Sequence, residues 1–275
     1  MPGINNWLTT NLAHDIDNCA SPFAVQFNLN GLDIDLNFEL ASDNTAKLIA
    51  NTYKDLHLCF SGGLDSEYVA SVLVRNKIEF TPVILIVDSL SAVDSWWALH
   101  FCNQNNLTPK VFDFRQHPDE IVKILLKHSL QFKLPYNSGL FATAVADIIG
   151  TGSVLTGCGE YIPVPSTYDE PIGDAVAILE CDYYTDLTPG HPGAFFSFTP
   201  SMCFSLLDAI DRNKNTQAAK AELFDLEFRA KIPIGFRSIT PTNLVPLVNK
   251  MIKPEPWRWV HKSWKQISES LKLHK

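Results

Sequence analysis

The chain has 275 residues, 46% of them hydrophobic and 19% charged, with a formal net charge of −8 at pH 7. This length suits one large α/β domain with additions, and the acidic balance argues against a protein that coats nucleic acid by bulk charge. No apolar run approaches the ~20 residues that cross a bilayer, and the N-terminus lacks the basic and apolar regions of a signal peptide. Six scattered cysteines without a C-x-x-C pair favour reduced thiols, so we expect a cytoplasmic protein.

The pattern of residues 23–38 predicts an N-terminal β-hairpin. Apolar and polar residues alternate over 23–29 and again over 32–38, and Asn30-Gly31 between them is the favoured pair for a type I′ turn. One face of this hairpin is apolar, and we expect the hairpin either to cover the core or to extend the sheet. A helix is predicted next, from an N-cap at Ser42 to about residue 54, and we assign residues 1–54 to this N-terminal hairpin and helix.

The most informative stretch is Ser61-Gly62-Gly63-Leu64-Asp65-Ser66, between the apolar residues 57–60 and a helix predicted over 67–75. A strand that runs through a Ser/Gly turn into a helix presents successive backbone N–H groups to an anion, and the glycines let the anion approach. The turn contains no lysine and is therefore no Walker A loop. Its amides, the hydroxyls of Ser61 and Ser66, and Asp65 through Mg²⁺ are expected to bind phosphate groups. The alternative is a helix N-cap without a ligand.

Strands and helices alternate from residue 56 to residue 160. Beyond the turn, strands are predicted over 82–87, 110–114 and 153–156, and helices over 91–105, 119–130 and 138–149. This alternation indicates βαβ units and a doubly wound parallel sheet, which is an α/β fold. Ligands of such sheets bind beyond the carboxyl ends of the strands, where the turn at Ser61 falls.

The composition changes after residue 160. Residues 161–200 are rich in Pro, Tyr, Asp and Gly and predict long irregular loops of the kind that form lids or binding segments, while residues 201–275 predict helices. Tryptophans interleaved with basic residues over 249–275 suit either a tRNA end or a helix docked through its tryptophans. We therefore expect a loop-rich and helical substrate or lid region over 163–275.

The six-residue turn resembles the pyrophosphate-binding loop of the N-type ATP pyrophosphatases, the PP-loop superfamily of adenine nucleotide alpha hydrolase-like proteins. Thr156-Gly157-Cys158-Gly159-Glu160 also follows a strand, and with its preceding helix it is similar to the synthetase domain of asparagine synthetase and β-lactam synthetase. The resemblance covers residues 55–162 and implies a Rossmann-like ATP-binding core there, with ATP and Mg²⁺ as cofactors. Cys158 stands where that group has an acidic residue, and its Asp-Glu pair is reduced to Glu160-Tyr161.

By this resemblance the pyrophosphate of ATP lies on residues 61–66, and adenine lies between Thr156-Gly157 and the backbone at Val87. Asp65 and Glu160 are implied as Mg²⁺ ligands and as catalytic residues. One cation from outside the loop is needed, because negative charge develops on the departing pyrophosphate. Lys231, in a turn-bounded stretch, is our candidate for this catalytic role. The cations considered in the C-terminal region are Lys220, Arg229, Lys231 and Arg237.

The resemblance implies an AMP-forming, ATP-dependent synthetase that makes a C–N bond. A carboxylate or amide oxygen of a small-molecule acceptor attacks the α-phosphorus, pyrophosphate leaves, and an amine or ammonia then displaces AMP. Two alternatives stay open: a nucleobase- or tRNA-modifying ATP pyrophosphatase of the thiolation or 7-deazaguanine type, and a non-catalytic ATP- or AMP-binding module. A homo-oligomer is also left open, and a membrane partner is not expected.

Overall fold

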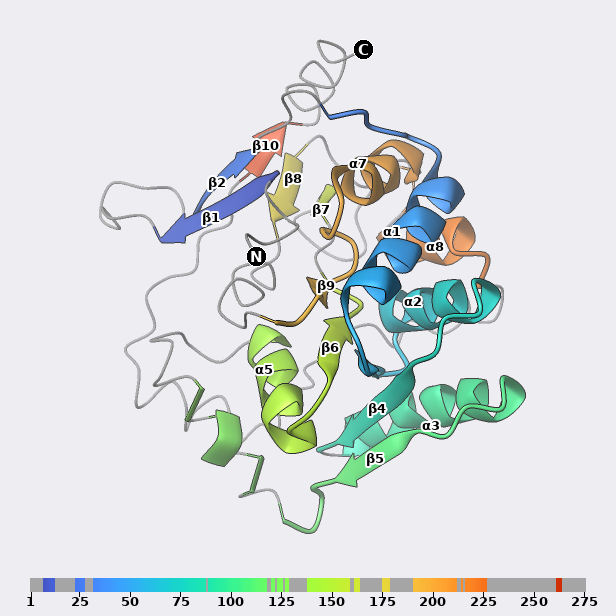
Figure 1. The fold of residues 1–275 in the computed structure, drawn as a ribbon, viewed down its shortest axis with the longest axis vertical. Coiled ribbons are helices and arrows are strands. Elements are labelled where there is room, and N and C mark those ends of the chain that lie inside the picture. Colours follow the sequence, from blue (N-terminus) through green and yellow to red (C-terminus); the bar gives the residue numbers. More distant parts are fainter. Residues whose placement is uncertain are drawn as a thin grey trace.

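A five-stranded parallel sheet lies at the centre of the computed structural model (Figure 1). Its strands are β3 (Leu56–Cys59), β4 (Thr81–Ile86), β5 (Lys110–Asp113), β6 (Ser153–Thr156) and β9 (Gly193–Ala194), in the order β5-β4-β3-β6-β9. Every neighbouring pair is parallel, which confirms the predicted doubly wound α/β sheet. The structure describes residues 7–12, 23–27, 32–87, 89–117, most of 120–128, 138–158, 161–163, 175–178, 190–211, 214, 216–226 and 261–263.

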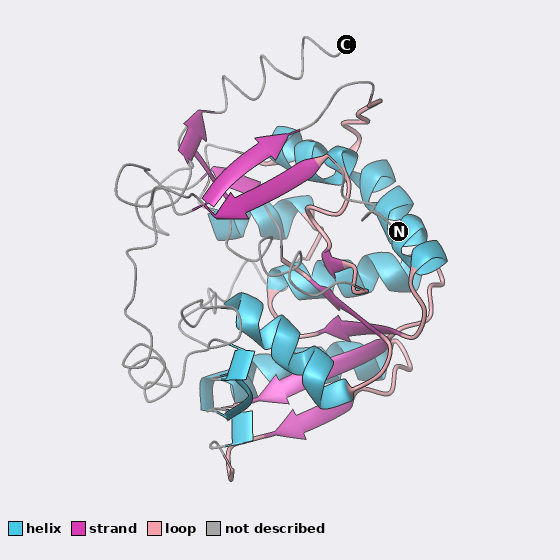
Figure 2. Cartoon of the chain, turned by 60° about the vertical axis from the view of Figure 1, so that its left-hand side comes forward, coloured by secondary structure: helices cyan, strands magenta, loops and turns pink. Residues whose placement is uncertain are grey.

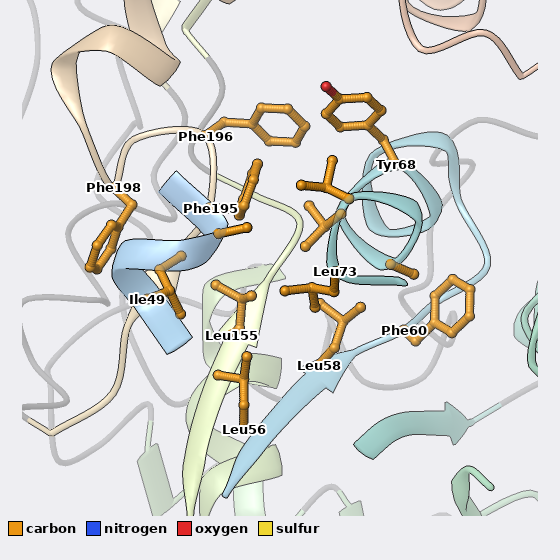
Figure 3. Packing of buried hydrophobic residues seen from close by; sticks show 14 of the residues in the cluster. Ile49, Leu56, Leu58, Phe60, Tyr68, Leu73, Leu155, Phe195, Phe196 and Phe198 are labelled. Carbon is orange, nitrogen blue, oxygen red and sulfur yellow. The ribbon is translucent and has the colours of Figure 1, made fainter. Parts of the chain in front are cut away.

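Helices cover both faces of this sheet, as βαβ units require. They are α1 (Phe38–Thr52), α2 (Leu64–Arg75), α3 (Ser89–Gln104), α5 (Ser138–Ile149), α7 (Pro200–Ala209) and α8 (Thr216–Leu223). On one face, Val145 of α5 packs with Val83 of β4 and Val154 of β6. The other face belongs to the main core, to which α1, α2 and α3 contribute and in which Leu58 and Leu73 are fully buried (Figure 3). The inner strands β3, β4 and β6 are largely apolar because both of their faces are covered, whereas β5 at the edge of the sheet is mostly exposed.

The predicted N-terminal hairpin is wrong in its pairing. β2 (Phe23–Phe27) pairs antiparallel with β1 (Leu8–Leu12), which precedes it, and residues 32–37 form no strand. Figure 2 shows this antiparallel pair apart from the central sheet. Alternation identified the strand at 23–27 but not its partner, because every half-buried strand has a period of two.

The first helix begins earlier than Ser42, the N-cap that the sequence predicts. α1 starts at Phe38, because the Asn37 side chain caps it by accepting a hydrogen bond from a first-turn N–H at 3.0 Å. Phe38 then stacks on Tyr68 of α2, with ring centroids 5.2 Å apart. The residues that alternate like a strand therefore lead into a helix, since this places the Phe38 ring against the core.

Strands also occur where loops and helices were predicted in the C-terminal part of the chain. β7 (Tyr161–Pro163), β8 (Ala175–Ile178) and β10 (His261–Ser263) form an antiparallel sheet in the order β10-β8-β7. Strands this short, with partners far away in the chain, leave no periodic signal in the sequence. The helices predicted after residue 200 are confirmed at α7 and α8, and residues 227–260 and 264–275 lie outside the described ranges.

None of the helices that the structure describes is long and apolar enough to cross a membrane. The regional boundaries predicted at residues 54 and 162 stay predictions.

Acidification is expected to destabilise this fold through three of its histidines. Burial lowers the pKa of His57, His128 and His191 below the ordinary histidine value of 6.5. Just below that pH the unfolded chain binds more protons than the folded one, so the free energy of unfolding falls as the pH falls. His191 contributes directly, because its Nδ1 accepts a hydrogen bond from the Val154 backbone N–H at 2.9 Å, which a proton on Nδ1 would prevent.

We therefore expect His191→Gln to reduce the loss of unfolding free energy between about pH 7 and pH 5.5, as measured by urea denaturation. The exposed His117 offers a matched control for the substitution itself, and His117→Gln should leave the free energy of unfolding at pH 7 unchanged. Equal pH dependence in the wild type and in His191→Gln would contradict the structural role of His191.

Candidate functional site

The loop of residues 61–66 lies at the point where the strand order of the sheet reverses. The chain leaves β3, builds β4 and β5 on one side of it, and returns to form β6 on its other side. Ligands of doubly wound sheets bind in the crevice at such a reversal, beyond the carboxyl ends of the strands. The loop follows the carboxyl end of β3, Gly157 follows the carboxyl end of β6, and Val87 follows β4, the other neighbour of β3.

Gly157 holds the two turns in contact. A methyl group on Gly157 would lie 2.7 Å from the backbone nitrogen of Ser66 and 2.9 Å from the carbonyl carbon of Asp65. No side chain fits between backbones this close, so the glycine is required by the approach of one turn to the other. The structure thus brings together the predicted residues of both turns.

Two serine hydroxyls hold the loop in shape. Ser61 Oγ accepts a hydrogen bond from the Gly63 backbone N–H at 3.1 Å and lies 3.1 Å from Ser66 Oγ, which donates to the Gly63 carbonyl at 3.0 Å. Gly62 has a φ of +84°, and a methyl group there would lie 2.1 Å from the carbonyl oxygen of Asp94 in α3. The loop is therefore fixed by its own hydroxyls and by its packing on α3.

The N-terminus of α2 has no side-chain cap among the described residues. Gly63 is the N-cap residue, and neither Ser61 nor Asp65 accepts a capping hydrogen bond from the first turn. The first N–H groups of a helix have no intrahelical partners and carry partial positive charge. The simple capping alternative therefore lacks its hydrogen bond, and these N–H groups can bind an anion.

A buried ion pair joins this loop to the C-terminal part of the chain. Lys220 Nζ in α8 lies 2.9 Å from Asp65 Oδ1, across 155 residues of sequence. The exposed fraction is 2% for Lys220 and 8% for Asp65. Lys220 was one of four cations considered from the sequence, whereas the preferred candidate Lys231 lies outside the described residues. The sequence signal that favours Lys220 is its position between Ala219 and Ala221 in a short helix, where small neighbours allow close packing.

Aromatic stacking sets the position of Lys220. Phe224, one turn further along, stacks on Tyr68 with ring centroids 4.3 Å apart and an interplanar angle of 21°. Tyr68 lies one turn after Asp65 in α2, and its hydroxyl donates a hydrogen bond to Ser42 at 2.9 Å. Figure 3 shows Tyr68 facing Phe196, which stacks on the same group of rings. Two side-chain contacts, one from α8 and one from Phe224 directly after it, therefore join this part of the chain to the first two turns of α2.

The segment that contains β9 is hydrogen-bonded to the backbone at the predicted adenine position. The Thr156 hydroxyl donates to the Gly193 carbonyl at 3.2 Å, and the Thr156 carbonyl accepts from the Phe195 N–H at 3.0 Å. The Cys158 carbonyl accepts from the Phe196 N–H at 3.1 Å. Sequence reasoning assigned this segment to an irregular loop, although its run of phenylalanines is a signal of burial. Adenine binding at Thr156, Gly157 and Val87 stays a prediction.

The described residues do not fit a resident Mg²⁺ ion at Asp65. Mg²⁺ prefers several oxygen ligands in octahedral geometry, yet the partner that the structure gives this carboxylate is the Lys220 ammonium. Among the described residues no group of three His, Cys, Asp or Glu side chains could hold a metal ion. Glu160, the second predicted ligand, lies outside the described residues, so its role stays a prediction.

No known protein-family model and no curated protein matches the sequence. Among solved structures, the chain is similar to an NH3-dependent NAD synthetase from Campylobacter jejuni (16% identity, TM-score 0.32), covering 45% of this chain and 57% of that one. It is also similar to an NMN synthetase from Francisella tularensis (16%, TM-score 0.31, 45% and 54%). A third similar structure is a U34-tRNA thiolase from Methanococcus maripaludis (13%, TM-score 0.27, 78% and 80%). The chain thus spans little more than half the length of the first two proteins.

The adjacent glycines of the loop are expected to differ in their tolerance of a methyl group. Gly62→Ala should lower the free energy of unfolding by at least about 2 kcal/mol, because it strains a left-handed residue and collides with the α3 backbone. Gly63 has a φ of −76°, and a methyl group there meets only the Ser61 hydroxyl at 3.3 Å, so Gly63→Ala should stay within about 1 kcal/mol of the wild type. Urea denaturation checks both values, and equal losses would contradict the described loop.

The ion pair should show strong coupling in a double-mutant cycle. Asp65→Asn and Lys220→Met should each lower the free energy of unfolding by about 3 kcal/mol, because each leaves one buried charge unpaired. The double variant should lose clearly less than the sum, since it leaves neither charge. Lys214, which pairs with Asp211 and Glu222 at the surface, is the control: Lys214→Met should change stability by less than about 1 kcal/mol. Additive losses at Asp65 and Lys220 would contradict the buried pair.

Proposed function

We propose that the chain is an ATP-dependent enzyme that adenylates its substrate and releases pyrophosphate. The observation that carries this proposal is the uncapped N-terminus of α2 behind the Ser/Gly loop, with the Lys220 ammonium paired to Asp65 beside it. Backbone N–H groups, a helix dipole and a buried cation at the carboxyl end of a central strand form a site that suits the outer phosphates of a nucleotide. The resemblance of residues 61–66 to a pyrophosphate-binding loop supports the same assignment.

In the proposed reaction a substrate oxygen attacks the α-phosphorus of ATP, and the bond from that phosphorus to the β-phosphate bridging oxygen breaks. Pyrophosphate leaves with the electron pair, and its growing negative charge is stabilised by the N–H groups of the loop and by Lys220. An amine or ammonia then attacks the adenylated carbon and displaces AMP. The protein contributes chiefly orientation and preorganised positive charge. In this proposal Lys220 takes the role that the sequence assigns to Lys231. The catalytic role of Lys231 stays a prediction.

For the substrate, we propose a small carboxylate or amide as acceptor and a nitrogen nucleophile, as in the asparagine synthetase group. The net charge of −8 favours a small acceptor over a large polyanion. A tRNA or nucleobase acceptor is the second candidate, and the basic, tryptophan-containing residues 249–275 favour it. Magnesium enters this proposal as the counter-ion of ATP.

The test measures the nucleotide products formed from Mg-ATP with a pooled small-molecule extract and, separately, with total tRNA. We expect AMP and pyrophosphate with the extract, and at least about a hundredfold less from the Asp65→Asn/Lys220→Met variant, which keeps no unpaired buried charge. Lys214→Met should retain the wild-type rate. Products with tRNA alone would favour the second candidate, ATP binding without products would favour a binding module, and absence of ATP binding would contradict the proposal.

A further inference from the structure

The Asp65 carboxylate already has a cation that the protein supplies. The Lys220 ammonium lies 2.9 Å from Asp65 Oδ1, and the exposed fraction of the side chain is 3% for Lys220 and 11% for Asp65. A buried charge pair of this kind is stable only while both partners are present, because either charge alone in the interior is strongly unfavourable. Asp65 also lies in the first turn of α2, where the helix dipole further favours its negative charge.

The surrounding packing keeps the ammonium at this carboxylate. Ala219 and Ala221 on either side of Lys220 are buried, and the Phe224 N–H donates to the Lys220 carbonyl at 2.8 Å. The Phe224 ring is in turn stacked on Tyr68, in the helix that carries Asp65. Withdrawing Lys220 from Asp65 therefore requires breaking a buried ion pair and moving a lysine whose neighbours along the chain are themselves packed in the core.

A divalent ion on Asp65 would have to share the carboxylate with Lys220 or displace it. Sharing places a second positive charge beside a buried ammonium, and displacement breaks the 2.9 Å contact between that ammonium and Asp65. Mg²⁺ also keeps several waters in its coordination shell, for which an Asp65 side chain that is 11% exposed offers little room. Both routes disfavour the metal relative to the existing pair.

We propose that Lys220 is the resident cation of the 61–66 loop and replaces a divalent metal ion on Asp65. The loop therefore binds its anion without a metal ion bound to this carboxylate. This differs from the expectation that the sequence resemblance raises, in which Asp65 is a Mg²⁺ ligand. The assignment of Lys220 to Asp65 stands on the ion pair, whereas the statement about the anion rests on the proposed function.

The first arm of the test titrates Mn²⁺ alone, followed by the electron paramagnetic resonance signal of the free ion, into the full chain. The wild type and the charge-balanced variant Asp65→Asn/Lys220→Met should bind Mn²⁺ with the same stoichiometry and affinity, because Lys220 keeps metal from Asp65. A site present in the wild type and missing from the double variant would overturn the proposal. Circular dichroism of both proteins confirms that folded chains are compared.

The second arm measures binding of inorganic pyrophosphate by calorimetry, in EDTA and in Mg²⁺. We expect binding in EDTA, weakened about tenfold or more in the double variant and unchanged in Lys214→Met. Binding in Mg²⁺ but not in EDTA would overturn the metal-independent loop while leaving the proposed function intact. If neither condition gives binding, the proposed function fails, and the Mn²⁺ comparison still decides whether Lys220 holds Asp65.

Discussion

The buried ion pair between Asp65 and Lys220 is the interaction on which the candidate site depends. It joins the first turn of α2 to α8 across 155 residues, at the loop that follows the central strand β3. The stacking of Tyr68 on Phe224, the residue that directly follows α8, adds a second contact between the same parts of the chain. Because neither charge is stable in the interior alone, the position of α8 and the electrostatics of the loop are set together.

Close backbone packing is the second constraint on the loop. Gly62 packs on the α3 backbone and Gly157 packs on the first turn of α2, each at distances that exclude a methyl group. Ser61 and Ser66 complete the turn with hydroxyl hydrogen bonds. The loop is therefore held by its packing on α3 and on the turn after β6, and by the hydrogen bonds of its own hydroxyls. Its N–H groups are oriented before any ligand binds. Preorganisation of this kind lowers the free-energy cost of binding charge.

The α/β core was predictable because its signals are local and repeated. Continuous apolar runs mark strands buried on both faces, and β4 at Thr81–Ile86 lies within one residue of the strand predicted over 82–87. The hairpin prediction for the N-terminal region was wrong, because the pairing of its strand depends on a segment elsewhere in the chain. The alternation of residues 32–38 is real, but the burial of Phe38 against Tyr68 and the cap at Asn37 make a helix of its end. The alternation of apolar and polar residues does not indicate which other strand will pair with this one.

The motif at residues 61–66 encodes its own backbone geometry, so the sequence was enough to locate the phosphate-binding candidate at the end of a central strand. Its glycines and serines act on neighbours within a few residues, and such short-range interactions need no knowledge of the rest of the chain. The cation that pairs with Asp65 could not be identified from local sequence in the same way. The sequence favoured Lys231, in its turn-bounded stretch, and the choice of Lys220 follows from its contact with Asp65 and from the stacking of Phe224 on Tyr68. Tertiary structure alone decides that contact, because a charge reaches a distant carboxylate only when the buried surfaces of two helices fit together.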